Sequence, residues 1–236
     1  MKLLNSGNAK TRKGEKSGWK TYGIHLAPAK LSGFNVCQFA SKGCAEACLN
    51  TAGRGAMSSV QKARIAKTRL FFTDKDKFTE MLWEEVSSAI KSAEKQDMKP
   101  CFRLNLTSDI PWEKVKRNGI TIFQSFPSVN FYDYTKSPAR MTSFLNKELP
   151  KNYHLTYSRS EETPDCNLKA FLMAGGNVAV VFSGELPKTY LGYPVIDGDQ
   201  DDLRFTDPSA HVVGLFAKGK AKIDLSGFVL DGRVAQ

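Results

Sequence analysis

Short runs of apolar residues recur along the chain and alternate with polar loops and amphipathic stretches. The runs are rich in β-branched and aromatic residues, a composition typical of strands. Asn177–Phe182 (NVAVVF) is apolar almost throughout, which is the pattern of a strand buried on both faces. The strands predicted in this way are Trp19–Leu26, Cys101–Leu106, Asn130–Thr135, Tyr153–Tyr157, Asn177–Phe182, His211–Phe216 and a shorter Pro194–Ile196.

Between these runs, apolar residues recur with the period of an α-helix. One predicted helix has an apolar face formed by Val60, Ala63, Ala66 and Leu70. The next has a buried stripe formed by Phe78, Leu82, Val86, Ala89 and Ala93, and Thr73 and Asp76 are spaced as a capping box at its start. Three further helices are predicted to begin near Asp109, Ser137 and Thr163, each followed closely by a proline, and the last ends at Gly175-Gly176.

Six or seven strands that alternate with helices predict a parallel sheet. A complete eightfold barrel usually takes about 250 residues, so we expect these 236 residues to form a trimmed parallel (β/α) barrel. An open doubly wound sheet is the alternative, although no G-x-G-x-x-G follows the first strand. Without repeats or a linker, the chain reads as one domain, residues 1–236, with a basic N-terminal arm (1–18) and a long turn-rich loop (27–55).

Each predicted strand leads into a polar loop, and in parallel α/β folds these loops converge on one face, where ligands bind. Lys136, Arg159 and Glu161 would give this face a mixed-charge mouth suited to an anionic or zwitterionic small molecule, and we expect them to be its catalytic groups. The ligand-lining residues expected beside them are Asn105, Thr107, Ser158, Ser183, Asp197 and Asp199. Helix capping alone would explain Asp109, Ser137 and Thr163.

Composition excludes several classes of protein. With 41% hydrophobic and 25% charged residues the chain is globular rather than disordered, and no apolar run is long enough to span a membrane. The polar N-terminus lacks the apolar region of a signal peptide, so we expect a cytoplasmic protein. Residues 1–70 carry 13 Lys and Arg against two acids, whereas the remainder carries 21 against 22. This basic third is either a surface for nucleic acid or a solvated face.

Three of the five cysteines fall within one loop, as Cys37, Cys44 and Cys48, with the spacing C-x6-C-x3-C. Three thiolates this close are stabilised by a metal, and a 4Fe-4S cluster with three cysteine ligands would leave its fourth iron open. A zinc site would need a fourth ligand, which His25, Cys101 or Cys166 would have to supply. The remaining alternative is that the thiols are buried without a metal, as small apolar residues.

In layout the chain resembles the radical S-adenosylmethionine enzymes, which carry three cluster-binding cysteines in the loop after the first strand of a partial barrel. The resemblance implies that the open iron binds S-adenosylmethionine, that Lys136, Arg159 and Glu161 hold its polar groups, and that an electron donor reduces the cluster. The spacing differs, because that superfamily has C-x3-C-x2-C with an aromatic residue before the last cysteine, where this chain has Ala47.

Longer segments resemble a tailed-phage family known from mycobacteriophage gene product eighty-eight. The segments that carry the resemblance are NSGNAKTRKG, GIHLAPAKLSGFNVC, GCAEACLNTAGRG, RLNLTSDIPWE, FYDYTKS, YSRSEE, GNVAVVF, VIDGDQDDLRF and GLFAKGKAK. The resemblance implies a phage-encoded protein in the cytoplasm of a bacterial host cell.

Two functions are therefore expected. The first is an iron–sulfur enzyme whose open iron cleaves S-adenosylmethionine reductively or acts as a Lewis acid on a bound hydroxyl, carboxylate or sulfur group. The second is a nucleic-acid-binding protein without catalysis, in which zinc or a cluster braces the basic N-terminal third. Phosphate-driven binding would weaken steeply with salt, which separates the two.

Overall fold

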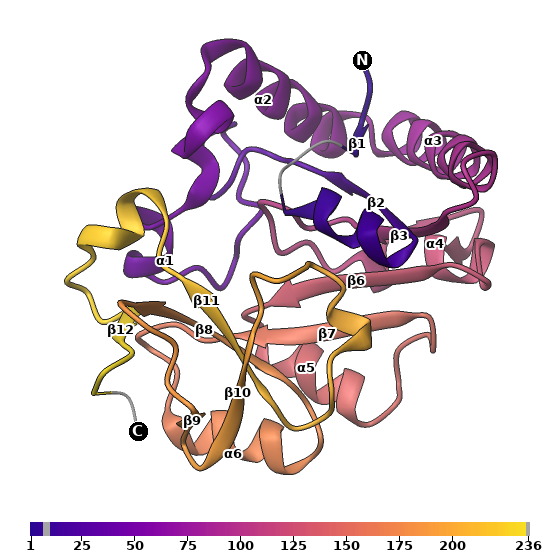
Figure 1. The fold of residues 1–236 in the computed structure, drawn as a ribbon. Helices are drawn as coiled ribbons and strands as arrows, with labels where there is room; N and C mark the ends of the chain where they lie inside the picture. Colours follow the sequence, from indigo (N-terminus) through magenta and orange to yellow (C-terminus); the bar gives the residue numbers. More distant parts are fainter. Residues whose placement is uncertain (7–9, 235–236) are drawn as a thin grey trace.

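The computed structural model describes residues 1–6 and 10–234, and its centre is one ten-stranded sheet (Figure 1). Along the sheet the strands follow the order β1-β2-β3-β6-β7-β8-β11-β10-β9, and β12 pairs with β8. Their bounds are β1 Leu4–Asn5, β2 Trp19–Ile24, β3 Lys99–Arg103, β6 Asn130–Thr135, β7 Tyr153–Ser158, β8 Val178–Ser183, β9 Thr189–Tyr190, β10 Tyr193–Asp197, β11 Val212–Phe216 and β12 Val229–Asp231. A separate two-stranded sheet joins β4 Lys116–Arg117 and β5 Ile120–Thr121.

Helices occupy the connections between the strands. The α-helices are α1 Lys42–Glu46, α2 Ser58–Thr73, α3 Lys75–Glu94, α4 Ile122–Ser125, α5 Pro138–Leu145 and α6 Asp165–Met173. The 3-10 helices are η1 Thr11–Ser17, η2 Leu49–Thr51, η3 Gly53–Ala56, η4 Trp112–Lys114, η5 Arg204–Thr206 and η6 Gly219–Ile223. Over the described part of the chain, none of the helices is both long and apolar enough to cross a membrane.

The seven predicted strands are confirmed and lie in the one sheet as β2, β3, β6, β7, β8, β11 and β10, each parallel to the next. Short strands β1 and β9 run antiparallel at its two edges. The two edges do not pair with each other within the described ranges, so the sheet is open and no closed barrel forms. The fold is thus mixed α/β with a mostly parallel central sheet.

The two faces of the sheet differ because side chains alternate along each strand. One face is apolar, and residues such as Phe102, Phe131 and Val180 pack there against helices α3, α5 and α6 in the main hydrophobic core. The other face carries polar and small residues, among them Cys101 and Tyr132. It is covered by 3-10 segments, since η1 contacts β2 and η5 contacts β6 and β7.

β12 lies where two neighbouring strands separate. β7 pairs with only the first part of β8, at Val178 and Ala179. β12 pairs with the second part, from Val181 to Ser183, while β11 occupies the opposite edge of β8. The C-terminal segment therefore enters the sheet at the carboxyl ends of β7 and β8. The sequence pattern did not predict this strand.

The helix predicted to begin near Asp109 is wrong. The short turn η4, the hairpin β4–β5 and the four-residue helix α4 follow β3, and none of them begins at Asp109. The amide oxygen of Asn105 accepts from the backbone N–H of Ile110 and the indole N–H of Trp112, and its amide nitrogen donates to the Ile110 carbonyl. These bonds fold the segment back on itself and bury Trp112, so no helix begins at Asp109.

The predicted capping box before α3 is also wrong, by one residue. Thr73 is the last residue of α2, and its hydroxyl donates to the Arg69 carbonyl. Asp74 is the N-cap of α3 and accepts from the Lys77 backbone N–H at 3.1 Å. The predicted N-cap at Ser137 and the predicted end of α6 near Gly175 are confirmed.

The basic N-terminal arm is packed against the rest of the domain. Leu3 and Leu4 are buried, and their backbone N–H groups donate to the Glu85 carboxylate. Part of the positive charge also turns inward, because Lys67 donates to the Leu3 carbonyl at 2.8 Å and Lys10 lies 3.4 Å from the Asp202 carboxylate. The basic third is thus only partly a surface feature.

Candidate functional site

The loop that carries the three cysteines is fixed to the end of β7 through Glu161. Ser41 is the N-cap of α1, and its hydroxyl accepts from the Cys44 backbone N–H at 3.2 Å. The Glu161 carboxylate accepts from the Ser41 hydroxyl and from the Gly43 backbone N–H, both at 2.7 Å. Burial opposes ionisation, but these bonds and the nearby Lys136 charge hold the pKa of Glu161 below its ordinary value. Glu161 thus anchors the short helix on which Cys44 lies.

A second anchor joins the same loop to the end of β3. The Asp109 backbone N–H donates to the Val36 carbonyl at 2.8 Å, and the Thr107 hydroxyl donates to the Leu26 carbonyl at 2.6 Å. The Cys37 thiol donates to the Thr107 carbonyl at 3.8 Å. Thr107, which sequence analysis placed at the mouth, therefore lies beside the first cysteine.

The loop after β3 is itself held in place by ion pairs with α5. Arg140 of α5 pairs with Asp109 and with Glu113, and the Asp109 carboxylate accepts from the Lys136 backbone N–H at 2.8 Å. Arg140 and Asp109 are both largely shielded from water. A charged pair in such surroundings needs additional hydrogen bonds to be stable, and the Thr135 hydroxyl supplies one at 3.2 Å from Asp109.

Cys37, Cys44 and Cys48 are half-buried free thiols, and they lie close enough for charge on one to shift the pKa of another. Burial raises the pKa of all three thiols, and burial together with the nearby Cys48 and Cys44 raises the pKa of Cys37 to about 11. Without a cation, these thiols keep their protons at neutral pH. Among the residues that the structure describes, no group of three or more His, Cys, Asp or Glu side chains converges on a point where one metal ion would fit.

Two cations lie close to these thiols. The Lys136 charge lowers the pKa of Cys44, and the Arg64 charge lowers the pKa of Cys48, each against the larger effect of burial. Arg64 is buried on α2 and donates to the Asn50 carbonyl at 3.0 Å, which keeps it beside the loop. Arg64 was not predicted as a site residue, because nothing in the sequence pattern of α2 distinguishes a buried arginine from a solvated one.

Lys136 is a fixed positive charge at the end of β6. Its ammonium donates to the Ser158 hydroxyl at 2.9 Å, the Ser158 carbonyl at 3.2 Å and the Arg159 carbonyl at 2.8 Å. It also lies 5.0 Å from the centre of the Phe228 ring. Burial lowers the pKa of Lys136 although nearby anions oppose the shift. With three acceptors, the ammonium form is fully hydrogen-bonded.

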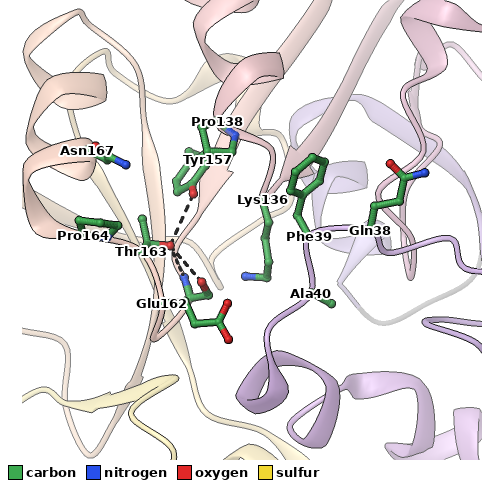
Figure 2. A pocket seen from close by; sticks show the side chains of 11 residues that line it. Gln38, Phe39, Ala40, Lys136, Pro138, Tyr157, Glu162, Thr163, Pro164 and Asn167 are labelled. Carbon is green, nitrogen blue, oxygen red and sulfur yellow. Dashed lines mark hydrogen bonds between the residues drawn. The ribbon is translucent and has the colours of Figure 1, made fainter.

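A pocket of about 310 Å³ opens beside Lys136 (Figure 2). It lies between the cysteine loop on one side and the beginning of α6 on the other. Figure 2 shows Lys136 and Phe39 next to each other at this pocket, with Glu162 and Thr163 across from them. The lining residues are Gln38, Phe39, Ala40, Lys136, Pro138, Tyr157, Ser160, Glu162, Thr163, Pro164 and Asn167. Sequence analysis identified only Lys136 of this set as a site residue.

Arg159 and Ser183 bind the chain's own C-terminal segment. The Arg159 guanidinium donates to the Gly227 carbonyl at 2.9 Å and to the Phe228 carbonyl at 3.2 Å. The Ser183 hydroxyl donates to the Leu230 carbonyl at 3.4 Å. These two residues lie at the ends of β7 and β8, and each donates to β12 or to the turn before it.

Asn105, Asp197 and Asp199 have local partners. Asn105 is buried, and besides its bonds to the 108–112 segment its amide donates to the Asp133 carboxylate at 3.1 Å. Asp197 accepts from the Asp199 backbone N–H at 2.8 Å. Asp199 accepts from Lys218 at 2.7 Å and from the Phe216 backbone N–H at 3.0 Å, so it ties the turn after β10 to the end of β11.

The polar face of the sheet holds a cluster that sequence analysis missed. Arg103 donates to both oxygens of Asp202 at 3.0 Å and lies 4.5 Å from the centre of the Tyr134 ring. The Tyr132 hydroxyl also donates to Asp202, at 3.2 Å. Arg103 and Asp202 are 99 residues apart in the sequence, so no local pattern predicts that they pair.

Comparison with known proteins identifies one family. A family model described as Gene product 88 matches residues 2–232, a range that includes the cysteine loop, the pocket and the C-terminal segment. No curated protein and no solved structure matches the chain.

Proposed function

The chain belongs to the gene product 88 family, and we propose that it binds a 4Fe-4S cluster through Cys37, Cys44 and Cys48. The observation that carries the proposal is the arrangement of these thiols. They lie on one loop at the carboxyl edge of a parallel sheet and are half-buried. Charge on one of these cysteines shifts the pKa of another. Anchors at two strand ends fix the loop, and that edge is where α/β proteins bind ligands.

A 4Fe-4S cluster and a zinc ion make different demands on the three thiols. Each thiolate of a 4Fe-4S cluster binds a different iron atom, so the sulfurs stand around the cluster and need not converge on one point. A zinc site would need four ligands within about 2.3 Å of a single ion. Cys101 is engaged in the interior with the Thr21 hydroxyl at 3.2 Å, and Cys166 is exposed on α6.

His25 is an unfavourable fourth ligand for a cation. Burial and the charges of Arg64, Lys67 and Arg103 lower the pKa of His25 to about 3. The same charges would oppose a metal ion at its ring. In this proposal the fourth iron takes no ligand from His25.

Lys136 and Arg64 would offset the negative charge of a cluster with three thiolates. Net charge and hydrogen bonds around a cluster set its reduction potential. Lys136, Arg159 and Glu161, expected as catalytic groups, take positioning roles in this proposal. Lys136 supplies charge beside Cys44, Glu161 holds α1, and Arg159 holds the segment before β12.

The pocket beside Lys136 would admit the ligand of the open iron. Lys136 and Glu162 give it both signs of charge, which suits a small zwitterion or anion. In a radical S-adenosylmethionine-like reaction that ligand would be S-adenosylmethionine, and an external donor would reduce the cluster. In a Lewis-acid reaction the iron would polarise a bound hydroxyl, carboxylate or sulfur group. The trimmed-barrel interpretation would make this edge the mouth of a partial barrel.

Single cysteine variants test the ligand assignment. Cys37→Ala, Cys44→Ala and Cys48→Ala should each lose most of the iron that the native chain retains after anaerobic purification. Cys101→Ala and Cys166→Ala are matched controls, because one is buried and the other exposed outside the loop, and they should keep native iron content. Unchanged iron in the first three variants would contradict the assignment.

A further inference from the structure

Helix α2 packs against the rest of the protein with a largely polar side rather than with its predicted apolar face. The side chains that it buries are Arg64, Lys67, Thr68 and Phe71. The side chains of the predicted apolar face are exposed or half-buried instead, namely Val60, Ala63, Ala66 and Leu70. That prediction is therefore wrong, and α2, which Figure 1 shows in purple at the outer edge of the fold, turns apolar side chains outward.

Two aromatic rings stack at the C-terminal end of α2. Phe72 and Phe34, the latter from the long loop before Cys37, have ring centres 4.6 Å apart and planes only 4° apart. Phe72 is 41% exposed, and Leu31 of the same loop is 57% exposed. Aromatic side chains usually bury most of their large surface. A parallel pair at the surface therefore forms a flat apolar platform.

The surrounding residues hold this platform in place. Ser32 is buried, and its hydroxyl accepts from the Phe34 backbone N–H at 3.2 Å. The Arg69 Nε donates to the Ser32 carbonyl at 3.2 Å, which joins the loop to α2. Phe71 packs perpendicular to Phe72, with ring centres 5.1 Å apart. Both rings are thus positioned by contacts within the chain.

The segments around the platform carry almost only positive charge. Residues 27–73 hold seven Lys and Arg and one acid, Glu46. Two of the seven are buried, and the exposed cations are Lys30, Lys42, Arg54, Lys62 and Arg69. Lys62, Arg69 and Phe72 share one face of α2, because their spacings are close to whole helical turns. We call the surface formed by Lys30, Leu31, Phe34, Lys62, Arg69 and Phe72 the stacking surface.

We propose that the stacking surface binds single-stranded nucleic acid. This function goes beyond cluster binding and does not depend on it. Unpaired bases stack on exposed aromatic rings, while Lys and Arg beside the rings contact the phosphates. The stacked Phe34 and Phe72 provide the rings, and Lys30, Lys62 and Arg69 provide the charge. In a duplex the bases already stack on one another, so only the charges would act.

An acidic protein is the other partner that a basic surface attracts. The centre of a protein interface is depleted of charged residues. Here exposed cations lie beside the apolar platform, and residues 49–73 contain no acid at all. This arrangement favours a polyanion that also carries flat rings.

Fluorescence anisotropy with fluorescein-labelled oligothymidylate measures the binding. The native chain should bind it more tightly than a DNA duplex of the same length, and its affinity should fall about tenfold between about 50 and about 200 mM salt. Phe72→Leu keeps an apolar side chain but removes the ring, and it should weaken binding about tenfold. Phe216→Leu is the matched control, because this ring at the end of β11 is 39% exposed, and it should bind like the native chain.

The paired variant K30E/K62E tests the phosphate contacts. It changes only exposed side chains, so it keeps the test valid if Phe72→Leu folds poorly. It should weaken binding about tenfold at low salt and make the affinity less dependent on salt. K91E/K95E makes the same change of charge on or just after α3 and should bind like the native chain.

Three results would overturn the proposal. The first is that neither oligothymidylate nor oligouridylate binds, the two probes that distinguish a DNA ligand from an RNA ligand. The second is that the duplex binds as tightly as the single strand, or that K30E/K62E binds like the native chain. The third is that poly-L-glutamate displaces the labelled strand as well as unlabelled oligothymidylate does, because an acidic protein would then satisfy the same surface.

Discussion

The carboxylate of Glu161 attaches the cysteine loop to the end of β7. Its two oxygens accept from Ser41 and Gly43, the residues at the beginning of the helix that carries Cys44. Hydrogen bonds to a charged group contribute about 1.5–3 kcal/mol. The neighbouring Glu162 is exposed at the pocket edge, so the two adjacent carboxylates have different roles.

Glu161→Ala should lower the free energy of unfolding by about 1.5–3 kcal/mol, because it leaves the start of α1 without its acceptor. It should also reduce the iron retained by the chain. Glu161→Gln keeps one amide oxygen for the Gly43 N–H and should cost less. Urea unfolding gives the stability, with Glu162→Ala as a control expected within about 0.5 kcal/mol of native. Equal losses at positions 161 and 162 would contradict the anchoring role.

At the scale of elements, the loop after β3 depends on Asn105. Its amide oxygen accepts three bonds, from the Ser108 hydroxyl, the Ile110 backbone N–H and the Trp112 indole, all in or next to the core. The same loop anchors the cysteine segment through Asp109 and Val36. An element without regular secondary structure thus fixes the position of Cys37.

Asn105→Ala should destabilise the protein by about 1–3 kcal/mol, since it leaves buried donors at Ile110 and Trp112 without an acceptor. Asn167→Ala, on the exposed side of α6, should have little effect. Near-ultraviolet circular dichroism should show altered tryptophan packing only in the first variant. A native spectrum and native stability for Asn105→Ala would mean that the loop is held by other contacts.

The strands were predictable because each parallel strand is a local apolar run, as in NVAVVF of β8. The absence of a helix at Asp109 was not predictable. The Asp109 side chain resembles a helix cap in the sequence, but in the structure it pairs with residues of distant elements, above all with Arg140. β12 has three residues and exists only because β7 and β8 separate there. The cysteine loop was visible in the sequence, whereas the roles of Arg64 and Glu161 depend on contacts that no local pattern encodes.

At the scale of the whole molecule, both chain ends close over the sheet. The N-terminal segment brings Lys10 to Asp202 on the polar face, and the C-terminal segment covers the ends of β7 and β8. η5 packs on the same polar face beside His154, whose Nε2 has no hydrogen-bond partner among the residues that the structure describes. Burial and the Arg204 charge lower the pKa of His154 to about 4.

This histidine makes stability depend on pH. It is neutral in the folded protein down to about pH 4, whereas in the unfolded chain it takes up a proton near pH 6.5. Stability from this group is therefore present above about pH 6.5 and is lost as the pH falls toward 4, by up to about 3 kcal/mol. Asp133, whose pKa burial raises to about 7, has the opposite effect over this range.

The His154 contribution is obtained as the difference between native protein and His154→Phe in urea unfolding at pH 7 and pH 4.5. Phenylalanine keeps an aromatic ring at this position, and the substitution removes no hydrogen bond of Nε2. The variant should gain stability relative to native as the pH falls. Parallel pH profiles for the two proteins would show that His154 is not held neutral.

Metal analysis of the native chain, purified without oxygen, is the decisive test of cluster binding. Iron, acid-labile sulfide and zinc are measured per chain together with the visible spectrum. Cluster binding by this chain predicts about four iron and four sulfide ions per chain and a brown absorbance near ~400 nm, as expected for a 4Fe-4S cluster. One zinc without sulfide, or neither metal, would contradict it.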